Sequence, residues 1–221
     1  MLKIRCSSIG KIMTNSRSKT ETLSKTCKTY LQELAIEEMY GKRKEFSSRY
    51  TDKGNQVEEE GIKLCESVLD LGFMYKNEEH FENDYLTGTP DVNTDIILDV
   101  KSSWDATTFP FFAEDIPNKD YYYQLQGYMA LTGKRKAYLC YCLINTPELM
   151  VEDEVRRAHW KEHLIDENEE LRNHVEAQHN FDNIPAERRI KTFEVKYDKD
   201  VVKAIYDRVK ECREYYNTLI E

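Results

Sequence analysis

The stretch from Thr87 to Ser103, T-G-T-P-D-V-N-T-D-I-I-L-D-V-K-S-S, constrains the fold most, because it joins a polar turn to a buried strand. The strand is predicted from a run of mostly β-branched apolar residues, Ile96, Ile97, Leu98 and Val100. Side chains alternate along a strand, so Asp99 and Lys101 are expected on one face. Asp91 lies just before the strand, where the turn can fold it back in a hairpin-like unit. Two carboxylates and an ammonium group would then converge.

This combination suits the hydrolysis of a phosphodiester. Such a substrate is an anion, so divalent ions must screen its charge, lower the pKa of a bound water and stabilise the oxygens of an in-line displacement. Mg²⁺ is usually held by one or two carboxylates plus phosphate oxygens, a role that Asp91 and Asp99 fit. Lys101 can orient or deprotonate the attacking water, or offset charge on the phosphate. The alternative is a turn aspartate followed by the solvated face of an ordinary antiparallel strand.

A helix is predicted from Lys119 to Thr132, because the apolar residues have helical spacing and Gly133 follows. A strand-like segment, K-A-Y-L-C-Y-C-L-I, comes next. Gln124 and Tyr128 are at i and i+4 and therefore lie on one helix face. A glutamine amide can donate to a phosphate or water and accept from a lysine. The alternative is a helix with a core of aromatic residues and a solvent-exposed Gln124.

A second helix is predicted from Lys53 to about Leu71, with an apolar stripe along it. Glu58 lies at the edge of that stripe. An inward-facing carboxylate needs a partner, and a metal ion or its bound water is one. The alternative is that Glu58 is a surface charge like Glu59 and Glu60.

The ordered set of motifs resembles the PD-(D/E)XK nuclease superfamily, and most closely its lambda-exonuclease-like (YqaJ-type) phage recombination exonucleases. The set is G-x-x-x-E on a helix, P-D, D-x-K on a strand, and Q-x-x-x-Y on a helix. The segment Arg5 to Ile9 is similar to the serine-containing start of the family's first helix. Four further residues have a spacing similar to that found in the second helix of the family: Tyr30, Leu34, Glu37 and Gly41.

The resemblance covers about residues 5–145 and implies an α/β (α+β) fold with a restriction-endonuclease-like core. In this core, helices flank a central mixed β-sheet. We therefore expect a single nuclease domain over residues 1–221, with an extension of extra C-terminal helices and a strand over 146–221.

The resemblance also implies a metal site. Asp91, Asp99 and the Val100 carbonyl would be ligands, and Glu58 would complete a second position or its water shell, giving two Mg²⁺ or Mn²⁺ ions. Asp99 stands where many relatives have glutamate, a change that the superfamily tolerates.

Further roles follow from the same resemblance. Lys101 would be the catalytic lysine, and Gln124 would contact it or the attacking water. Ser7 would help to bind a phosphate, with Arg5 and Tyr128 as further candidate DNA contacts. The arginine that would recognise a 5′ phosphate is not placed by any clean match.

The implied function is a Mg²⁺-dependent exonuclease that resects linear double-stranded DNA, 5′ to 3′, in phage-type recombination and repair. A trimer and a single-strand annealing protein as partner are expected with it. The alternatives are an endonuclease of restriction or repair type in the same superfamily, and a non-catalytic DNA-binding protein that retains the fold. The complete set of motif residues argues against the last.

Composition allows this function. The net charge is −9, but residues 1–44 carry ten Lys or Arg against four Asp or Glu. This basic region can guide a phosphate backbone, or it can simply solvate helix surfaces. The six scattered cysteines predict reduced structural thiols, and neither a signal peptide nor a long apolar segment is found. We therefore expect a soluble, cytoplasmic protein without membrane contact.

The remaining segments say less about function. A loop is predicted from Trp104 to Lys119, whose phenylalanines can stack on bases or anchor the loop to the core or to another subunit. A long charged helical region is predicted over residues 148–178. Its His159 and His163 can form a metal pair or lie on a solvated helix. A strand over 188–197 and a final helix capped by Asp198 should follow.

Overall fold

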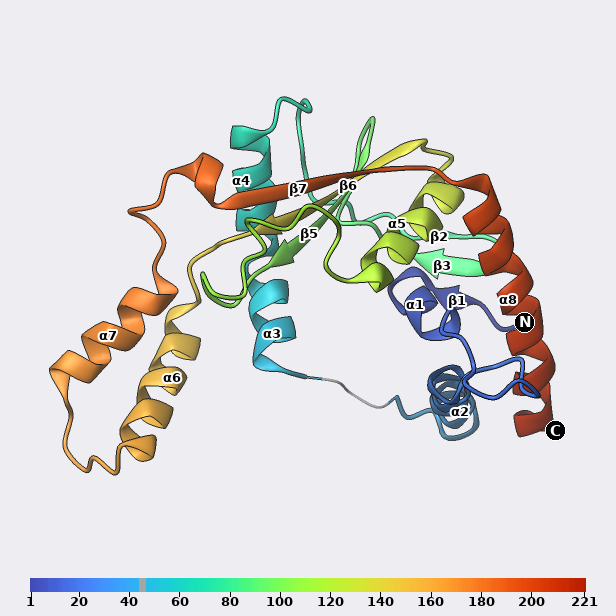
Figure 1. Ribbon diagram of the computed structural model, residues 1–221, viewed down its shortest axis with the longest axis horizontal. Coiled ribbons are helices and arrows are strands. Elements are labelled where there is room, and N and C mark those ends of the chain that lie inside the picture. The colour runs from blue at the N-terminus through green and yellow to red at the C-terminus, as the bar shows by residue number, and fades with distance from the viewer. Residues whose placement is uncertain (44–46) are drawn as a thin grey trace.

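The computed structural model describes residues 1–43 and 47–221, which form a mixed α/β structure around two β-sheets (Figure 1). The larger sheet has the strand order β4-β5-β6-β7. The strands β5 and β6 are parallel, and the two outer strands are antiparallel to their neighbours. The bounds of these strands are Val92–Asn93 for β4, Ile97–Ser102 for β5, Lys136–Cys142 for β6 and Ile190–Lys196 for β7. The predicted central mixed sheet is confirmed.

A smaller three-stranded sheet lies beside it, with the order β1-β3-β2. Its strands are short: β1 Ile4–Arg5, β2 Phe81–Glu82 and β3 Leu86–Gly88. It connects the first residues of the chain to the segment that leads into Asp91.

Helices surround the sheets and extend the molecule at both ends (Figure 1). Near the two termini lie α1, α2 and α8, whereas α6 and α7 form a hairpin at the opposite end. None of the described helices is long and apolar enough to cross a membrane. The helices are α1 Ile9–Ile12, α2 Lys25–Tyr40, α3 Arg49–Gln56, α4 Glu58–Val68, α5 Lys119–Thr132, α6 Glu148–Lys161, α7 Glu169–His179 and α8 Lys199–Ile220, with 3-10 helices η1 Cys6–Ser8 and η2 Ala186–Arg188.

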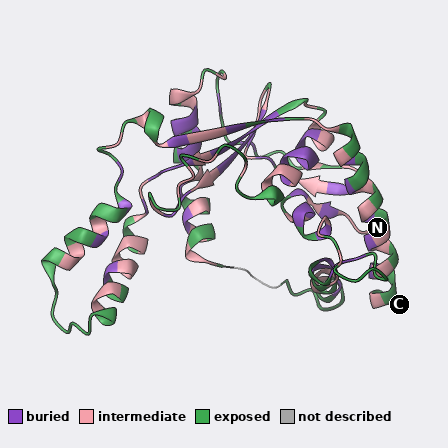
Figure 2. Cartoon of the chain, in the orientation of Figure 1, coloured by how far each residue is buried: buried purple, intermediate pink, exposed green. Residues whose placement is uncertain are grey.

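The side chains of β5 divide between two apolar cores, as the alternation of a strand requires. Ile97 belongs to the core formed with α2, α5 and α8, while Leu98 and Val100 belong to the core formed with α4. Figure 2 shows buried residues concentrated along the sheet and the helices on its two faces. Asp99 therefore faces the α5 side, opposite Leu98 and Val100, and the predicted two-faced strand is confirmed.

The single helix predicted from Lys53 to Leu71 is wrong, because the chain leaves helical geometry at Val57 (φ −110°, ψ 16°). The buried Lys53 ammonium donates hydrogen bonds to Ser103 O at 2.8 Å and Trp104 O at 2.9 Å, which ties α3 to the end of β5. After the break, α4 packs against β5 and β6, while α3 keeps its own contact with β5.

Gly61 allows α4 to approach β5. A Cβ at this position would lie 2.7 Å from Val100 Cγ1, a stiff β-branched neighbour. We expect Gly61→Ala to lower the free energy of unfolding by about 1–3 kcal/mol through overpacking, measured by urea denaturation. Gly54→Ala in α3 is the matched control, because a Cβ at that position would meet no atom within 4 Å. The control should raise stability by about 0.5–1 kcal/mol, and equal stability of both variants would contradict the close approach.

The predicted C-terminal extension contains part of the core. Strand β7 pairs with β6 from Ile190 to Lys196, and α8 buries one apolar face. Asp198 caps α8 by accepting from the amides of Asp200 and Val201, as predicted. The core thus continues well beyond residue 145.

The long charged helix predicted over residues 148–178 is two helices, α6 and α7, separated at 162–168. His163 lies outside α6 with φ 56°, and the two ring nitrogens of His159 contact Val155 O and the Asn168 amide. The i, i+4 metal pair is therefore not formed.

All six cysteines are free and buried, as expected for structural thiols. Cys142 Sγ lies 3.5 Å from Cys65 Sγ, and Cys27 Sγ lies 3.5 Å from Cys212 Sγ.

Candidate active site

A short hairpin brings Asp91 to the middle of β5. Strands β4 and β5 pair with Val92 opposite Leu98, and Asp91 directly precedes β4. Its Oδ2 accepts a hydrogen bond from the Val100 amide at 2.7 Å. Asn77 fixes the same turn. Its backbone N–H donates to Asp91 O at 2.8 Å, and its side-chain Nδ2 donates to Pro90 O at 3.0 Å. The predicted return of Asp91 towards Asp99 is confirmed.

Asp99 is completely buried at the centre of the site. Its Oδ1 accepts from Gln124 Nε2 at 2.9 Å. Its Oδ2 lies 2.5 Å from Lys101 Nζ but has no hydrogen bond of good geometry within the described residues. One buried carboxylate oxygen is thus left with an ion-pair contact alone.

The structure brings Gln124 to Asp99 and shows no hydrogen bond between Gln124 and Lys101 within the described residues, while the alternative contact of Gln124 with the attacking water stays a prediction. Its Nε2 also donates to the Tyr128 hydroxyl at 3.0 Å, as their i, i+4 spacing allows. Both side chains are buried, so a solvent-exposed Gln124 is excluded. The Tyr128 ring belongs to the apolar core, and its role as a direct DNA contact stays a prediction.

Lys101 carries its positive charge in this arrangement. Burial acts to lower the pKa of its ammonium, but Asp99 and Asp91 raise it, and the net effect is a pKa above the ordinary lysine value. The Nζ atom also lies 5.0 Å from the centre of the Tyr121 ring on α5. In the metal-free site Lys101 is therefore an ammonium group paired with Asp99.

Glu58 is the first residue of α4 and forms an ion pair with Lys76, with Nζ and Oε1 3.2 Å apart. Its charge is among the influences that raise the pKa of Asp91, so the carboxylate belongs electrostatically to the site. Lys76 lies in the loop before β2, a segment with no periodic signal in the sequence.

The donor set fits an oxygen-preferring divalent ion. Within residues 1–43 and 47–221, no group of three or more His, Cys, Asp or Glu side chains is arranged to hold a metal. Mg²⁺ does not need one, because it is usually held by one or two carboxylates, waters and phosphate oxygens. The mutual repulsion of Asp91 and Asp99 and the incompletely satisfied Asp99 Oδ2 would both be relieved by a cation. The Val100 carbonyl as a third ligand stays a prediction.

The protonation of Asp91 should make the metal-free protein pH-sensitive. Burial, and then the charge of Asp99, raise the pKa of Asp91 to about 7. Because this pKa lies above the ordinary aspartate value of about 4, the carboxyl group of Asp91 stabilises the folded protein fully below about pH 4. This contribution to stability is lost as the pH rises through about 7.

We therefore expect the free energy of unfolding in EDTA to fall between pH 5 and 8, with Asp91→Asn removing that component. Urea denaturation at several pH values measures it. Identical pH dependence in the wild-type and Asp91→Asn proteins would contradict the assignment.

No hydrogen bond or ion pair within the described residues joins the N-terminal candidates, Ser7 and Arg5, to the carboxylates. Ser7 is exposed in η1, and Arg5 is engaged in an ion pair with Glu37 at 2.9 Å. Phosphate binding by Ser7 and Arg5 stays a prediction.

In the loop after β5, the Phe112 ring is 91 % exposed, so anchoring of this residue to the core is excluded.

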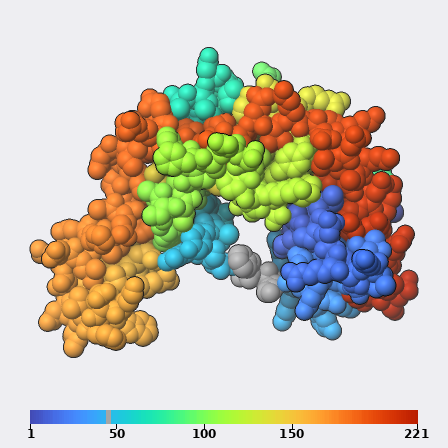
Figure 3. All heavy atoms as spheres, in the orientation of Figure 1, coloured from blue at the N-terminus to red at the C-terminus, as the bar shows by residue number. Residues whose placement is uncertain are grey.

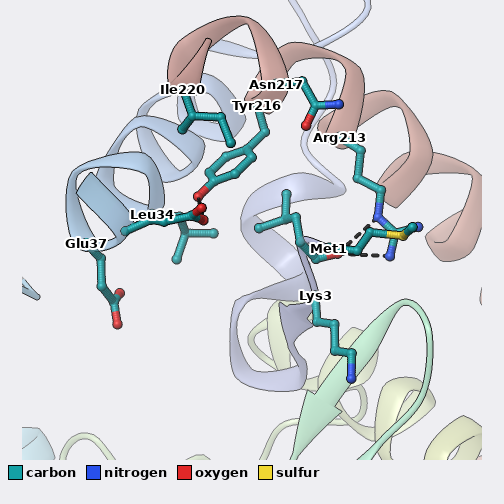
Figure 4. A pocket seen from close by; sticks show the side chains of 10 residues that line it. Met1, Lys3, Leu34, Glu37, Arg213, Tyr216, Asn217 and Ile220 are labelled. Carbon is teal, nitrogen blue, oxygen red and sulfur yellow. Dashed lines mark hydrogen bonds between the residues drawn. The ribbon is translucent and has the colours of Figure 1, made fainter. Parts of the chain in front are cut away.

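The surface is hollowed between α3 and the N-terminal helices (Figure 3). A hollow of about 850 Å³ between α1 and α2 is lined by hydroxyl side chains, by the basic Lys11, Arg17 and Lys25, and by the acidic Glu21 and Glu33. Another cavity, of about 610 Å³, lies between α2, α8 and the first residues, where Tyr216, Asn217 and Arg213 line it (Figure 4). Neither contains Asp91, Asp99 or Lys101.

Known structures match the chain over nearly its whole length. A phage-related exonuclease from Haemophilus somnus 129PT is 32 % identical, with a TM-score of 0.80 over 99 % of this chain and 95 % of that one. The alkaline exonuclease LHK-Exo from Laribacter hongkongensis is 14 % identical, with a TM-score of 0.66 over 99 % of this chain and 89 % of that one. LHK-Exo in complex with dAMP matches with a TM-score of 0.65 and 15 % identity over the same shares. No protein-family model and no curated protein sequence matches.

Proposed function

The chain belongs to the lambda-exonuclease-like (YqaJ-type) family of PD-(D/E)XK nucleases, and from this premise we propose that it is a metal-dependent exonuclease acting on the ends of linear double-stranded DNA. The observation that carries the proposal is the cluster of the buried Asp99 with the half-buried Asp91 and Lys101, in which Gln124 bonds to the central carboxylate. A non-catalytic scaffold has no need to hold two repelling carboxylates, one of them fully buried, beside a lysine.

The residues divide the work of hydrolysis. Asp91 and Asp99, with the Val100 carbonyl, would hold a Mg²⁺ or Mn²⁺ ion, which when bound lowers the pKa of a water and screens the phosphate. Gln124 holds one oxygen of Asp99 and is itself held by Tyr128, so the other oxygen stays directed at the site. Asp91 is oriented by the Val100 amide and by Asn77.

Lys101 supplies a positive charge beside the reacting phosphate. While the carboxylates are free of metal, its ammonium is paired with Asp99. Where Asp91 and Asp99 hold a cation, the ammonium of Lys101 would be available to orient the attacking water or to offset charge on the phosphate.

The proposal extends to the substrate and the partners. DNA as substrate agrees with the exonucleases of similar structure, one of which is in complex with dAMP. The hollow between α1 and α2, in which three basic side chains face two acidic ones, can contact a phosphate backbone, and Ser7 with Arg5 can contact a terminal phosphate. Resection from 5′ to 3′ in phage-type recombination, a trimer, and a single-strand annealing partner complete the proposal.

Digestion of three substrates tests it. We expect linear duplex to be shortened in Mg²⁺ or Mn²⁺, covalently closed plasmid to stay intact, and EDTA to stop the reaction. End-labelled duplex then reports the strand polarity. Cutting of the closed plasmid would favour an endonuclease, and no cleavage with any divalent ion would favour a DNA-binding protein.

A further inference from the structure

We propose that Lys76 is a built-in competitor for a second divalent cation at Glu58, so that the site binds one ion readily and a second one weakly. The inference rests on the proposed function, because it takes Asp91 and Asp99 as the holders of the first ion. Nothing in the motifs assigns a role to Lys76.

The backbone around Lys76 is fixed to the site. The next residue, Asn77, is buried and bonds to the backbone of Pro90 and Asp91 through both its amide and its side chain. On the other side, the Met74 amide donates to Glu66 Oε1 at 3.2 Å, and the Met74 side chain is buried against α4. The lysine is therefore held beside Asp91 and α4, and its position does not depend on a freely moving loop.

The Lys76 ammonium forms an ion pair with Glu58, the carboxylate that a second metal ion would need as a ligand. Its Nζ lies 3.2 Å from Glu58 Oε1, and the two side chains are 42 % and 23 % exposed. The close packing of Gly61 on Val100 places the start of α4 next to β5. The carboxylate of Glu58 can thus serve the ammonium or a metal ion, and the two cations exclude each other on the contacted oxygen.

The charges of the site balance around one ion. Three carboxylates, Asp91, Asp99 and Glu58, face two ammonium groups, Lys101 and Lys76, which leaves one net negative charge when all are ionised. One divalent ion turns this into a single positive charge, which a phosphodiester anion neutralises. A second divalent ion would have to enter a site that is already neutral or positive unless Lys76 moved away.

Calorimetric titration with Mn²⁺ of the metal-free full chain tests the inference, with the wild-type protein compared with Lys76→Met, Lys76→Arg and Glu58→Gln. We expect Lys76→Met to bind a second Mn²⁺ about tenfold more tightly than wild type. The substitution removes a positive charge that repels the ion and leaves the Glu58 carboxylate without its ammonium partner. Lys76→Arg keeps the charge and should behave as wild type. The double variant Lys76→Met with Glu58→Gln should lose the gain.

Two further proteins separate the possible failures. Lys63→Met removes an exposed lysine from α4 and should leave both binding steps unchanged. Asp99→Asn should weaken the first step. If Mn²⁺ binds in an Asp99-dependent way but Lys76→Met leaves the second step unchanged or weakens it, only the role of Lys76 is overturned. If no Mn²⁺ binding depends on Asp99, the metal site of the proposed function fails and the role of Lys76 with it.

Discussion

Asp99→Asn should lower the rate of linear duplex hydrolysis on the order of 10³-fold or more, because it removes the charge of the central carboxylate. Asparagine has nearly the same shape and can still accept from Gln124 through its amide oxygen. It cannot pair with a divalent ion or with the Lys101 ammonium as a carboxylate does. Initial rates at saturating DNA and Mg²⁺ measure the loss.

The control for this variant is Asp95→Asn, which changes an exposed aspartate in the turn between β4 and β5. Its rate should equal that of the wild type. Circular dichroism spectra of both variants should show a folded protein. An Asp99→Asn protein that is folded and retains even a tenth of the wild-type rate would exclude Asp99 from the chemistry.

Lys101→Met should lower the hydrolysis rate by about 10² to 10⁴-fold, the range over which a positioned proton-transfer or charge-stabilising group contributes. Unlike Asp99→Asn, it should leave Mn²⁺ affinity unchanged or raise it, because an ammonium group 2.5 Å from Asp99 Oδ2 competes with the ion. Lys101→Arg should not restore the rate, since a guanidinium group differs in shape and hydration from an ammonium group.

Lys136→Met is the matched control for this substitution. Lys136 is a strand lysine of β6 whose partner, Glu194, lies outside the carboxylate cluster. The hydrolysis rate of the Lys136→Met protein should equal that of the wild type. Parallel loss of metal binding and of hydrolysis in Lys101→Met would mean that the lysine maintains the structure of the site instead of serving the reaction.

The hairpin and α5 show how much the sequence can predict. The alternation along β5 and the i, i+4 pair on α5 are local geometry, so the shared face of Asp99 and Lys101 and the contact of Gln124 with Tyr128 follow from spacing alone. Gly133, in the left-handed conformation with φ 74°, ends α5 where the sequence predicts.

The features that sequence reasoning missed depend on tertiary contacts. The break at Val57 follows a helix whose Lys53 bonds to carbonyl groups about 50 residues away, and no local pattern signals those bonds. Asn77 and Lys76 reach the site from an irregular loop, so periodicity gives them no signal. The sequence cannot identify the partner of Gln124, because a glutamine amide can serve an acid or a lysine and only the fold decides which is nearer.

Diffraction from crystals soaked in Mn²⁺ tests the central claim most directly, because anomalous scattering locates the ion without any assay of activity. We predict an anomalous peak between the carboxylates of Asp91 and Asp99 in the wild-type protein and no peak there in Asp99→Asn crystals grown in the same form. A wild-type protein that hydrolyses DNA in the same Mn²⁺ solution, but whose crystals place the ion elsewhere, would contradict the account.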